Sequence, residues 1–251
     1  MFRWDQVWYY LFQDPHLYFL QAAWITLWIA VVAQAIGVVL GLFLALMQMS
    51  KSPFLRWPTL VYIWFFRGSP LLVQVLLLWI GLPKVWPGAL LPAWACVLVA
   101  FSLNEGAYMA EIIRAAIGSV DTGQMEAARA LGMRYSLGMR RIVLPQAARV
   151  VIPPLGNEFN NMLKTTSIAS VISLEELTGS ARDLGAQTFT TFELLIVATV
   201  YYLLFTTLWG FVQSRIEARF DPDRSNVAVK EKPKNVAERA LGFELPRAGA
   251  R

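Results

Sequence analysis

One uncharged, apolar run of 26 residues, 22–47, limits what this chain can fold into more than any other feature of its sequence. About 20 apolar residues, wound as a helix, span the hydrocarbon core of a bilayer. The run is too long for the apolar part of a cleaved signal peptide, and it follows an aromatic-rich segment rather than a basic one. It therefore predicts a helix that crosses a membrane. The composition agrees, because 57% of the residues are hydrophobic and only 16% are charged, which argues against an ordinary soluble enzyme.

Further segments have the length of a membrane span. One is a second uncharged run near the C-terminal end, and three others contain a few charged or polar positions. The five predicted spans are 22–47, 57–82, 88–114, 150–174 and 194–212. The expected fold is therefore an all-α integral membrane protein, with about five transmembrane helices in a domain over 20–220.

The basic residues predict which end of each span faces the cytoplasm. With five spans the chain ends lie on opposite sides. One side holds 18 of the 22 Lys and Arg residues, the other holds Arg3, Lys84 and Arg182, and Lys164 lies inside a span. Because cytoplasmic loops are enriched in Lys and Arg, we expect the N-terminus outside and the C-terminus in the cytoplasm.

The two flanking segments are expected to differ from the spans. In residues 1–19, Trp4, Trp8 and Phe12 share one helical face, which is typical of a helix lying in the membrane interface, here on the periplasmic side. Residues 221–251 contain seven basic and five acidic residues and three prolines, so we expect a disordered cytoplasmic tail. That tail is either simply solvated or in contact with anionic lipid.

The cytoplasmic loop 119–145 is polar but strongly patterned. Asp121 can cap a first helix, and Gly132 follows that helix where a left-handed residue is favoured. A second helix is expected to start near Ser136 and to stop before Pro145. From spacing alone, two interpretations stay open. The loop is either a plug for a partner's groove or a structural hairpin that covers the bundle.

The residues of this loop carry a resemblance to a known family. Their spacing matches every fixed position of the EAA loop of ABC-importer permeases. The matching residues are Glu126, Ala127, Ala128, Gly132, Ile142, Leu144 and Pro145. Three further stretches, 66–74, 107–114 and 154–159, resemble the polar amino-acid branch of that family. The resemblance covers about residues 15–220.

The resemblance implies a division of labour among several chains. Permeases of this kind sit in the bacterial inner membrane, pair as homo- or heterodimers and rest on two cytoplasmic ABC ATPase subunits. An extracytoplasmic binding protein delivers the amino acid, and the EAA loop couples ATPase closure to the permease. The chain contains no phosphate-binding loop of the G-x-x-x-x-G-K-[ST] type. ATP and Mg are therefore expected on the partner, with no cofactor, catalytic residue or nucleic-acid partner for this chain. A single cysteine and a single histidine also argue against a metal site.

Ionisable groups inside a span are costly and are therefore candidates for function. Glu158 follows Pro153 and Pro154, which are able to break or loosen the start of a helix. The substrate-binding candidates around it are Asn157, Glu158, Asn161 and Lys164, with Glu105 from the third span. The carboxylates can accept from a substrate ammonium, and the amides and Lys164 can serve a substrate carboxylate. Structural pairing of Glu158 with Lys164, or contact with a second permease, is the alternative.

Two other polar features have structural interpretations. Arg67 precedes Gly68, Ser69 and Pro70, which predicts a kink in the second span. Glu111 and Arg114 are spaced as an i,i+3 ion pair.

The sequence does not determine which amino acid is transported. It also leaves two other classes of function to consider. Members of the resembled branch often have an acidic residue after the lysine, where this chain has Thr165. If that acid selects cationic side chains, this chain should favour a neutral or different polar amino acid. A secondary transporter would use Glu105, Glu158 and Lys164 as a proton relay, but no internal repeat of the kind such transporters show is evident. A membrane-embedded enzyme is the least supported, since the sequence has no nucleophile motif.

Overall fold

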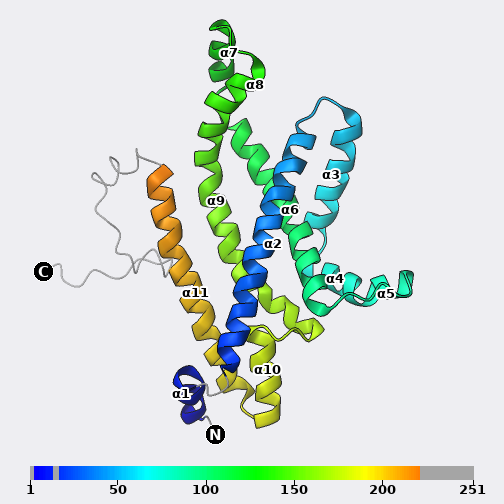
Figure 1. The fold of residues 1–251 in the computed structure, drawn as a ribbon, viewed down its shortest axis with the longest axis vertical. Coiled ribbons are helices and arrows are strands. Elements are labelled where there is room, and N and C mark those ends of the chain that lie inside the picture. The colour runs from blue at the N-terminus through cyan, green and yellow to red at the C-terminus, as the bar shows by residue number, and fades with distance from the viewer. Residues whose placement is uncertain (1–2, 14–16, 221–251) are drawn as a thin grey trace, which may run out of the picture.

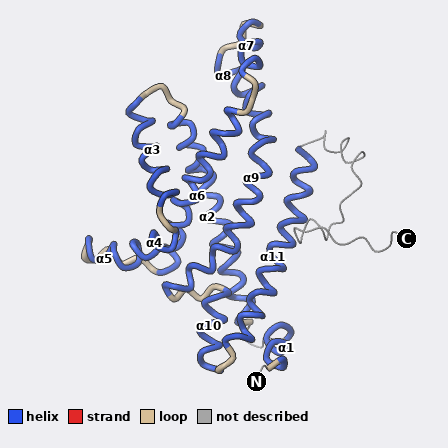
Figure 2. Tube along the Cα trace, turned by 180° about the vertical axis from the view of Figure 1, so that it is seen from behind, coloured by secondary structure: helices blue, strands red, loops and turns tan. Residues whose placement is uncertain are grey.

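The computed structural model describes residues 3–13 and 17–220, and all regular structure in these residues is helical (Figures 1 and 2). The predicted cytoplasmic tail, 221–251, lies outside the described residues. Long helices form an elongated bundle, with a helical hairpin at one end and short helices at the other. We call these the hairpin end and the opposite end.

Four long helices form the body of the bundle: α2 (Tyr18–Gln48), α6 (Ala93–Gly118), α9 (Leu144–Thr165) and α11 (Thr191–Phe220). Beside α6 runs α3 (Pro53–Gly68), which is followed by α4 (Leu71–Leu76), a π-helical stretch (Leu77–Gly81) and α5 (Leu82–Val85). The described chain begins at the opposite end, and α11 runs from there toward the hairpin end (Figure 1). The core lies where α2, α4, α6 and α9 meet, around Ile29, Phe101 and Leu163.

The expectation of an all-helical membrane protein is confirmed, but the helices are not five uniform spans. Within the described residues, three helices are long and apolar enough to cross a membrane, namely α2, α6 and α11. A fourth candidate is α3 with α4–α5, a pair bent by 104°. The helix over the predicted fourth span, α9, is not among them. Its asparagines, with Glu158 and Lys164, lower its hydropathy.

Helices α2 and α6 approach each other closely because α2 presents glycines at the contact. A Cβ atom on Gly37 would overlap the Glu105 side chain, and one on Gly41 would overlap Met109. Small residues allow membrane helices to pack backbone against side chain without a cavity. This contact fixes the height of Glu105 in the bundle.

The hairpin differs from the predicted pair of short helices in its second arm. The first arm, α7 (Thr122–Ala130), is capped by Asp121, which accepts from the Gly123 N–H, as expected. The second arm, α8 (Tyr135–Gly138), runs through a π-helical turn (Met139–Val143) directly into α9. The prediction of a stop before Pro145 is therefore wrong. Proline is tolerated in the first turn of a helix, and the wider turn before it leaves room for the ring.

A second correction concerns Pro153 and Pro154, which lie inside α9 without interrupting it. The helix therefore starts well before the predicted loosened region.

At the opposite end, α1 (Trp4–Phe12) is anchored to the protein. Val7 is buried in a cluster with Phe19 and Leu194, and the Arg3 N–H donates to Glu193 (2.9 Å). The exposed face holds the predicted aromatic stripe, with Trp8 stacked on Phe12. The connection 175–193, between the last two predicted spans, contains a further helix, α10 (Leu177–Thr188).

Candidate functional site

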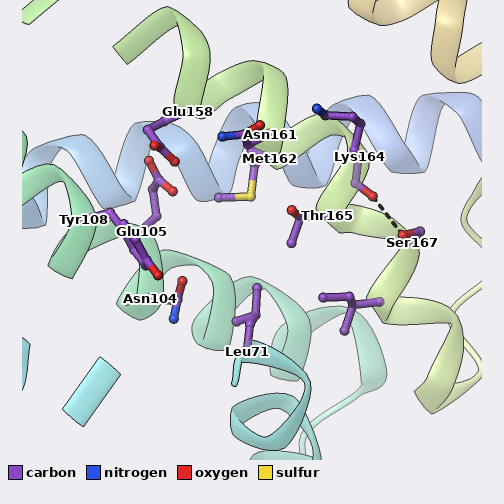
Figure 3. A pocket seen from close by; sticks show the side chains of 11 residues that line it. Leu71, Asn104, Glu105, Tyr108, Glu158, Asn161, Met162, Lys164, Thr165 and Ser167 are labelled. Atoms are coloured by element: carbon purple, nitrogen blue, oxygen red, sulfur yellow. Dashed lines mark hydrogen bonds between the residues drawn. The ribbon is translucent and has the colours of Figure 1, made fainter. Parts of the chain in front are cut away.

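A polar cavity of about 650 Å³ opens midway along the bundle, between α4, α6, α9 and the 3₁₀ turn Thr166–Ile172 that follows α9 (Figure 3). Most of its polar lining comes from two helices that are distant in sequence. Asn104, Glu105 and Tyr108 come from α6, and Glu158, Asn161, Lys164 and Thr165 come from α9. Leu71, Met162, Ser167 and Ile168 complete the lining. Most of the residues predicted to bind substrate therefore meet at one place.

Glu105 is the most enclosed charged residue of the cavity, with 4% of its surface exposed. Its Oε1 accepts from the side-chain amide of Gln34 on α2 (2.8 Å). Figure 3 shows the carboxyl groups of Glu105 and Glu158 facing each other, with Asn161 and Lys164 farther along α9. The cavity thus places two carboxyl groups opposite each other.

Asn157 is the predicted substrate residue that the structure does not bring to the cavity. Its Oδ1 accepts from Gln213 on α11 (3.1 Å). Successive residues of a helix point about 100° apart, so Glu158 faces the cavity while Asn157 faces α11. By their spacing, Asn157, Glu158, Asn161 and Lys164 can share one broad helical face, but of these four only Glu158, Asn161 and Lys164 line the cavity.

The break between α3 and α4 lies next to the cavity, which Leu71 and Asn104 line. Gln74 Nε2 donates to the carbonyl oxygens of Phe66 (3.0 Å) and Ser69 (3.1 Å). Asn104 Nδ2 donates to the same Phe66 oxygen (2.9 Å) and to Gln74 Oε1 (3.1 Å). No role was predicted for Gln74, although it is a single amide side chain in an otherwise apolar stretch, four residues after a proline.

An ion cluster connects the end of α3 to α6. The predicted pair of Glu111 and Arg114 is present (2.9 Å). Gln48 also donates to Glu111 (2.7 Å), and Arg67 lies 3.8 Å from the same carboxylate. The Arg67 guanidinium lies 5.2 Å from the centre of the Tyr108 ring. This cluster fixes α3 against α6 next to the cavity.

The hairpin presents some of its motif residues and buries others. Glu126 and Ala127 are exposed, whereas Ala128 is buried against the hairpin itself. A Cβ on Gly138 would come within 3.4 Å of the Ala128 Cβ, so the two arms pack through small residues. Gly132 has a φ of +76°, which favours glycine at the end of α7. Leu144 and Pro145 are exposed and Ile142 is half-buried.

The part of the chain that the structure describes contains no group of three or more His, Cys, Asp or Glu side chains that could hold a metal ion.

Comparisons with known proteins agree with this geometry. Residues 37–222 match the family described as binding-protein-dependent transport system inner membrane component. The arginine transport system permease protein ArgU of Corynebacterium glutamicum is 39% identical over 233 residues, which cover 88% of this chain and 72% of ArgU. The L-cystine transport system permease protein TcyB of Bacillus subtilis is 41% identical, over 74% of this chain and 79% of TcyB.

A solved structure is similar over most of the chain. The chain of an amino acid ABC transporter, crystallised with histidines, is 40% identical and superposes with a TM-score of 0.78. The match covers 82% of this chain and 95% of that one. The family decides against the secondary transporter and the membrane enzyme, and it assigns ATP hydrolysis to a separate ATPase subunit. This chain belongs to the binding-protein-dependent transport system inner membrane components, as the permease subunit of an amino-acid ABC importer.

Proposed function

We propose that the cavity between α6 and α9 is the substrate site of this permease, and that it takes a basic amino acid such as arginine. The observation that carries the proposal is the pair of facing carboxyl groups of Glu105 and Glu158 (Figure 3). Two negative charges facing each other in a membrane protein repel, and a cation between them relieves that repulsion. The α-ammonium and the side-chain cation of a basic amino acid offer two such charges.

The remaining lining suits the other end of the substrate. Asn161 and Lys164 lie farther along α9, and their N–H groups can donate to a substrate carboxylate. The name of the relative ArgU supports arginine, whereas TcyB is named for L-cystine and Thr165 favours a neutral substrate. An experiment therefore has to distinguish a basic substrate, which would need the carboxylates of the cavity, from a neutral one.

The test is direct binding of radiolabelled arginine and glutamine to the purified transporter, assembled with its ATPase but without a binding protein. Glu158→Gln and Glu105→Gln each remove one charge and keep the side-chain shape. We expect each to weaken arginine binding by about tenfold or more and to change glutamine binding less. Glu175→Gln, at an exposed glutamate outside the cavity, is the matched control. Equal losses for both amino acids would reject the basic substrate.

We also propose an orientation and a coupling role for the hairpin. The hairpin end faces the cytoplasm and the opposite end faces outward, with α9 and the bent α3–α5 segment counted as spans to give five crossings. The described chain begins at the opposite end, and α11, its last helix, runs from there toward the hairpin end (Figure 1), which supports an odd number of crossings. The charge asymmetry of the loops supports the direction.

The hairpin then meets the ATPase through α7, while a second permease and a binding protein complete the importer. Glu126 and Ala127 are the motif residues that α7 presents outward, and the buried Ala128 keeps the two arms together. Co-purification tests this role. We expect Glu126→Lys to lose the ATPase, whereas Asp183→Lys, at an exposed position of α10 at the opposite end, retains it. Retention of the ATPase by both variants would contradict the coupling role.

A further inference from the structure

The break between α3 and α4 leaves backbone carbonyl groups without helical partners in a segment that we propose crosses the membrane. Ser69 is extended (φ −112°, ψ 145°) and Pro70 has no N–H, so the helical bonds of the last turn of α3 cannot continue. Unpaired carbonyls in a membrane are costly, and irregular backbone survives there only where other groups satisfy it. At this break the satisfying groups are the amides of Gln74 and Asn104.

Gln74 does not line the cavity, but two residues next to it do, namely Leu71 and Asn104. Leu71 lies one helical turn before it on α4, and Asn104 donates to its Oε1 (3.1 Å). Only 4% of the Gln74 surface is exposed. A buried, fully bonded amide has a single favourable orientation, so Gln74 acts on the cavity through fixed neighbours.

The hydrogen bonds also determine which end of the Asn104 amide faces the substrate. Its Nδ2 is committed to the Phe66 carbonyl and to Gln74 Oε1. The Oδ1 atom therefore turns to the cavity, as Figure 3 shows. An oxygen at this position accepts hydrogen bonds and lies on the same helix as Glu105. The Asn104 oxygen therefore adds a hydrogen-bond acceptor on the α6 side of the cavity, where a cationic substrate could donate to it.

We infer that Gln74 is a positioning residue of the substrate pocket. It holds the bend between α3 and α4, and it orients Asn104 so that the amide oxygen faces the substrate. This inference rests on the proposed substrate site. The part of the inference that Gln74 holds the bend between α3 and α4 does not depend on what the pocket binds.

The bend is tested by the distance between spin labels at Val61 on α3 and Ile80 after α4, both exposed. The labels are placed in a Cys96→Ala background and diluted with unlabelled chain in the assembled transporter. We expect one narrow distance distribution in the parent and a broad one in Gln74→Met, which has similar volume but no donor. The matched control is Thr199→Val, because the Thr199 hydroxyl donates to the Leu195 carbonyl within an unbroken helix. An unchanged narrow distribution in Gln74→Met would overturn the inference.

The second measurement is the dissociation constant for arginine in the same preparations. We expect it to rise by about fivefold in Gln74→Met, the equivalent of one lost hydrogen bond, and to stay unchanged in Thr199→Val. Gln74→Glu keeps an acceptor for Asn104 but has no donor for the Phe66 carbonyl, so it should broaden the distances as well. A broad distribution with unchanged arginine affinity would refute the positioning role. If the parent itself does not bind arginine, the proposed substrate fails, and the label distances still decide whether Gln74 holds the bend.

Discussion

Two proline-containing segments of this permease look alike in sequence and behave differently in the structure. Ser69 and Pro70 separate α3 from α4 with a bend of 104°, whereas Pro153 and Pro154 lie inside an uninterrupted α9. At the first segment, two side-chain amides donate to the carbonyls at the break. Along α9, donors from α11 reach the Gly156 carbonyl (Trp209, 2.8 Å) and the Pro153 carbonyl (Gln213, 3.4 Å). Side-chain donors reach carbonyl groups at both segments, so the donors do not by themselves decide the outcome. The segments differ in their backbone, which is extended at Ser69 and stays helical through Pro153 and Pro154.

The largest expected effect comes from removing the prolines themselves. Replacing Pro153 and Pro154 with alanine restores two helical N–H groups in α9. The free energy of unfolding should rise, by at most about 3 kcal/mol for a helix-interior proline. Pro70→Ala adds no helical bond, because Pro70 caps α4 in an extended conformation. It should lower the free energy of unfolding by under about 1 kcal/mol, through lost chain stiffness. Thermal unfolding of the purified assembly measures both changes in stability. If the unfolding midpoint shifted in the same direction for both variants, the two proline segments would not differ as we expect.

A matched pair of asparagine variants tests the role of polar donors at each segment. Asn104→Leu leaves the Phe66 carbonyl with one donor fewer and Gln74 without its partner, and should destabilise the protein by about 2 kcal/mol. Asn160→Leu on α9 should cost less, because Asn160 Oδ1 is buried with no hydrogen-bond partner among the described residues. The two unfolding midpoints provide the measurement. An equal cost would show that the amide at the break has no special role.

The contact between α11 and α9 should contribute a smaller amount. Trp209→Phe removes the indole donor to the Gly156 carbonyl and keeps the ring against Phe159. An interhelical hydrogen bond in a membrane protein is worth about 0.6 kcal/mol on average, so we expect a loss of that size. Trp24→Phe, at an exposed position of α2, controls for the change of ring. A loss above that for Asn104→Leu would reverse the ranking of the two segments.

The smallest expected effect belongs to the Ser69 hydroxyl. It donates to the Phe65 carbonyl (2.7 Å) and accepts from Gln74 (2.9 Å), but it is not buried. Ser69→Ala should therefore lower the free energy of unfolding by about 0.5 kcal/mol, and arginine binding should stay within twofold of the parent, or about 0.4 kcal/mol. A complete loss of arginine binding would show that Ser69, rather than Gln74, is the main residue that holds the bend between α3 and α4.

The sequence by itself determined the class of the protein and the outline of its two functional regions. The apolar runs required membrane helices, because a bilayer offers backbone groups no other partner. The residues from Glu126 to Pro145 carried the resemblance to the EAA loop, for which we propose the coupling role, and the cost of charge in a span pointed to Glu105 and Glu158. These features are local in sequence or follow from composition, so they can be found without coordinates.

Only the tertiary structure decided how these features are used. It turned Glu158 toward the cavity and Asn157 toward α11, because a helix has one orientation relative to its neighbours that spacing does not fix. It buried Ala128 and exposed Ala127. It also brought Gln74 to carbonyls five and eight residues away and to an asparagine thirty residues away. Hydrogen bonds between distant segments depend on how helices pack, so residue spacing shows neither these partners nor the different outcomes at the two proline segments.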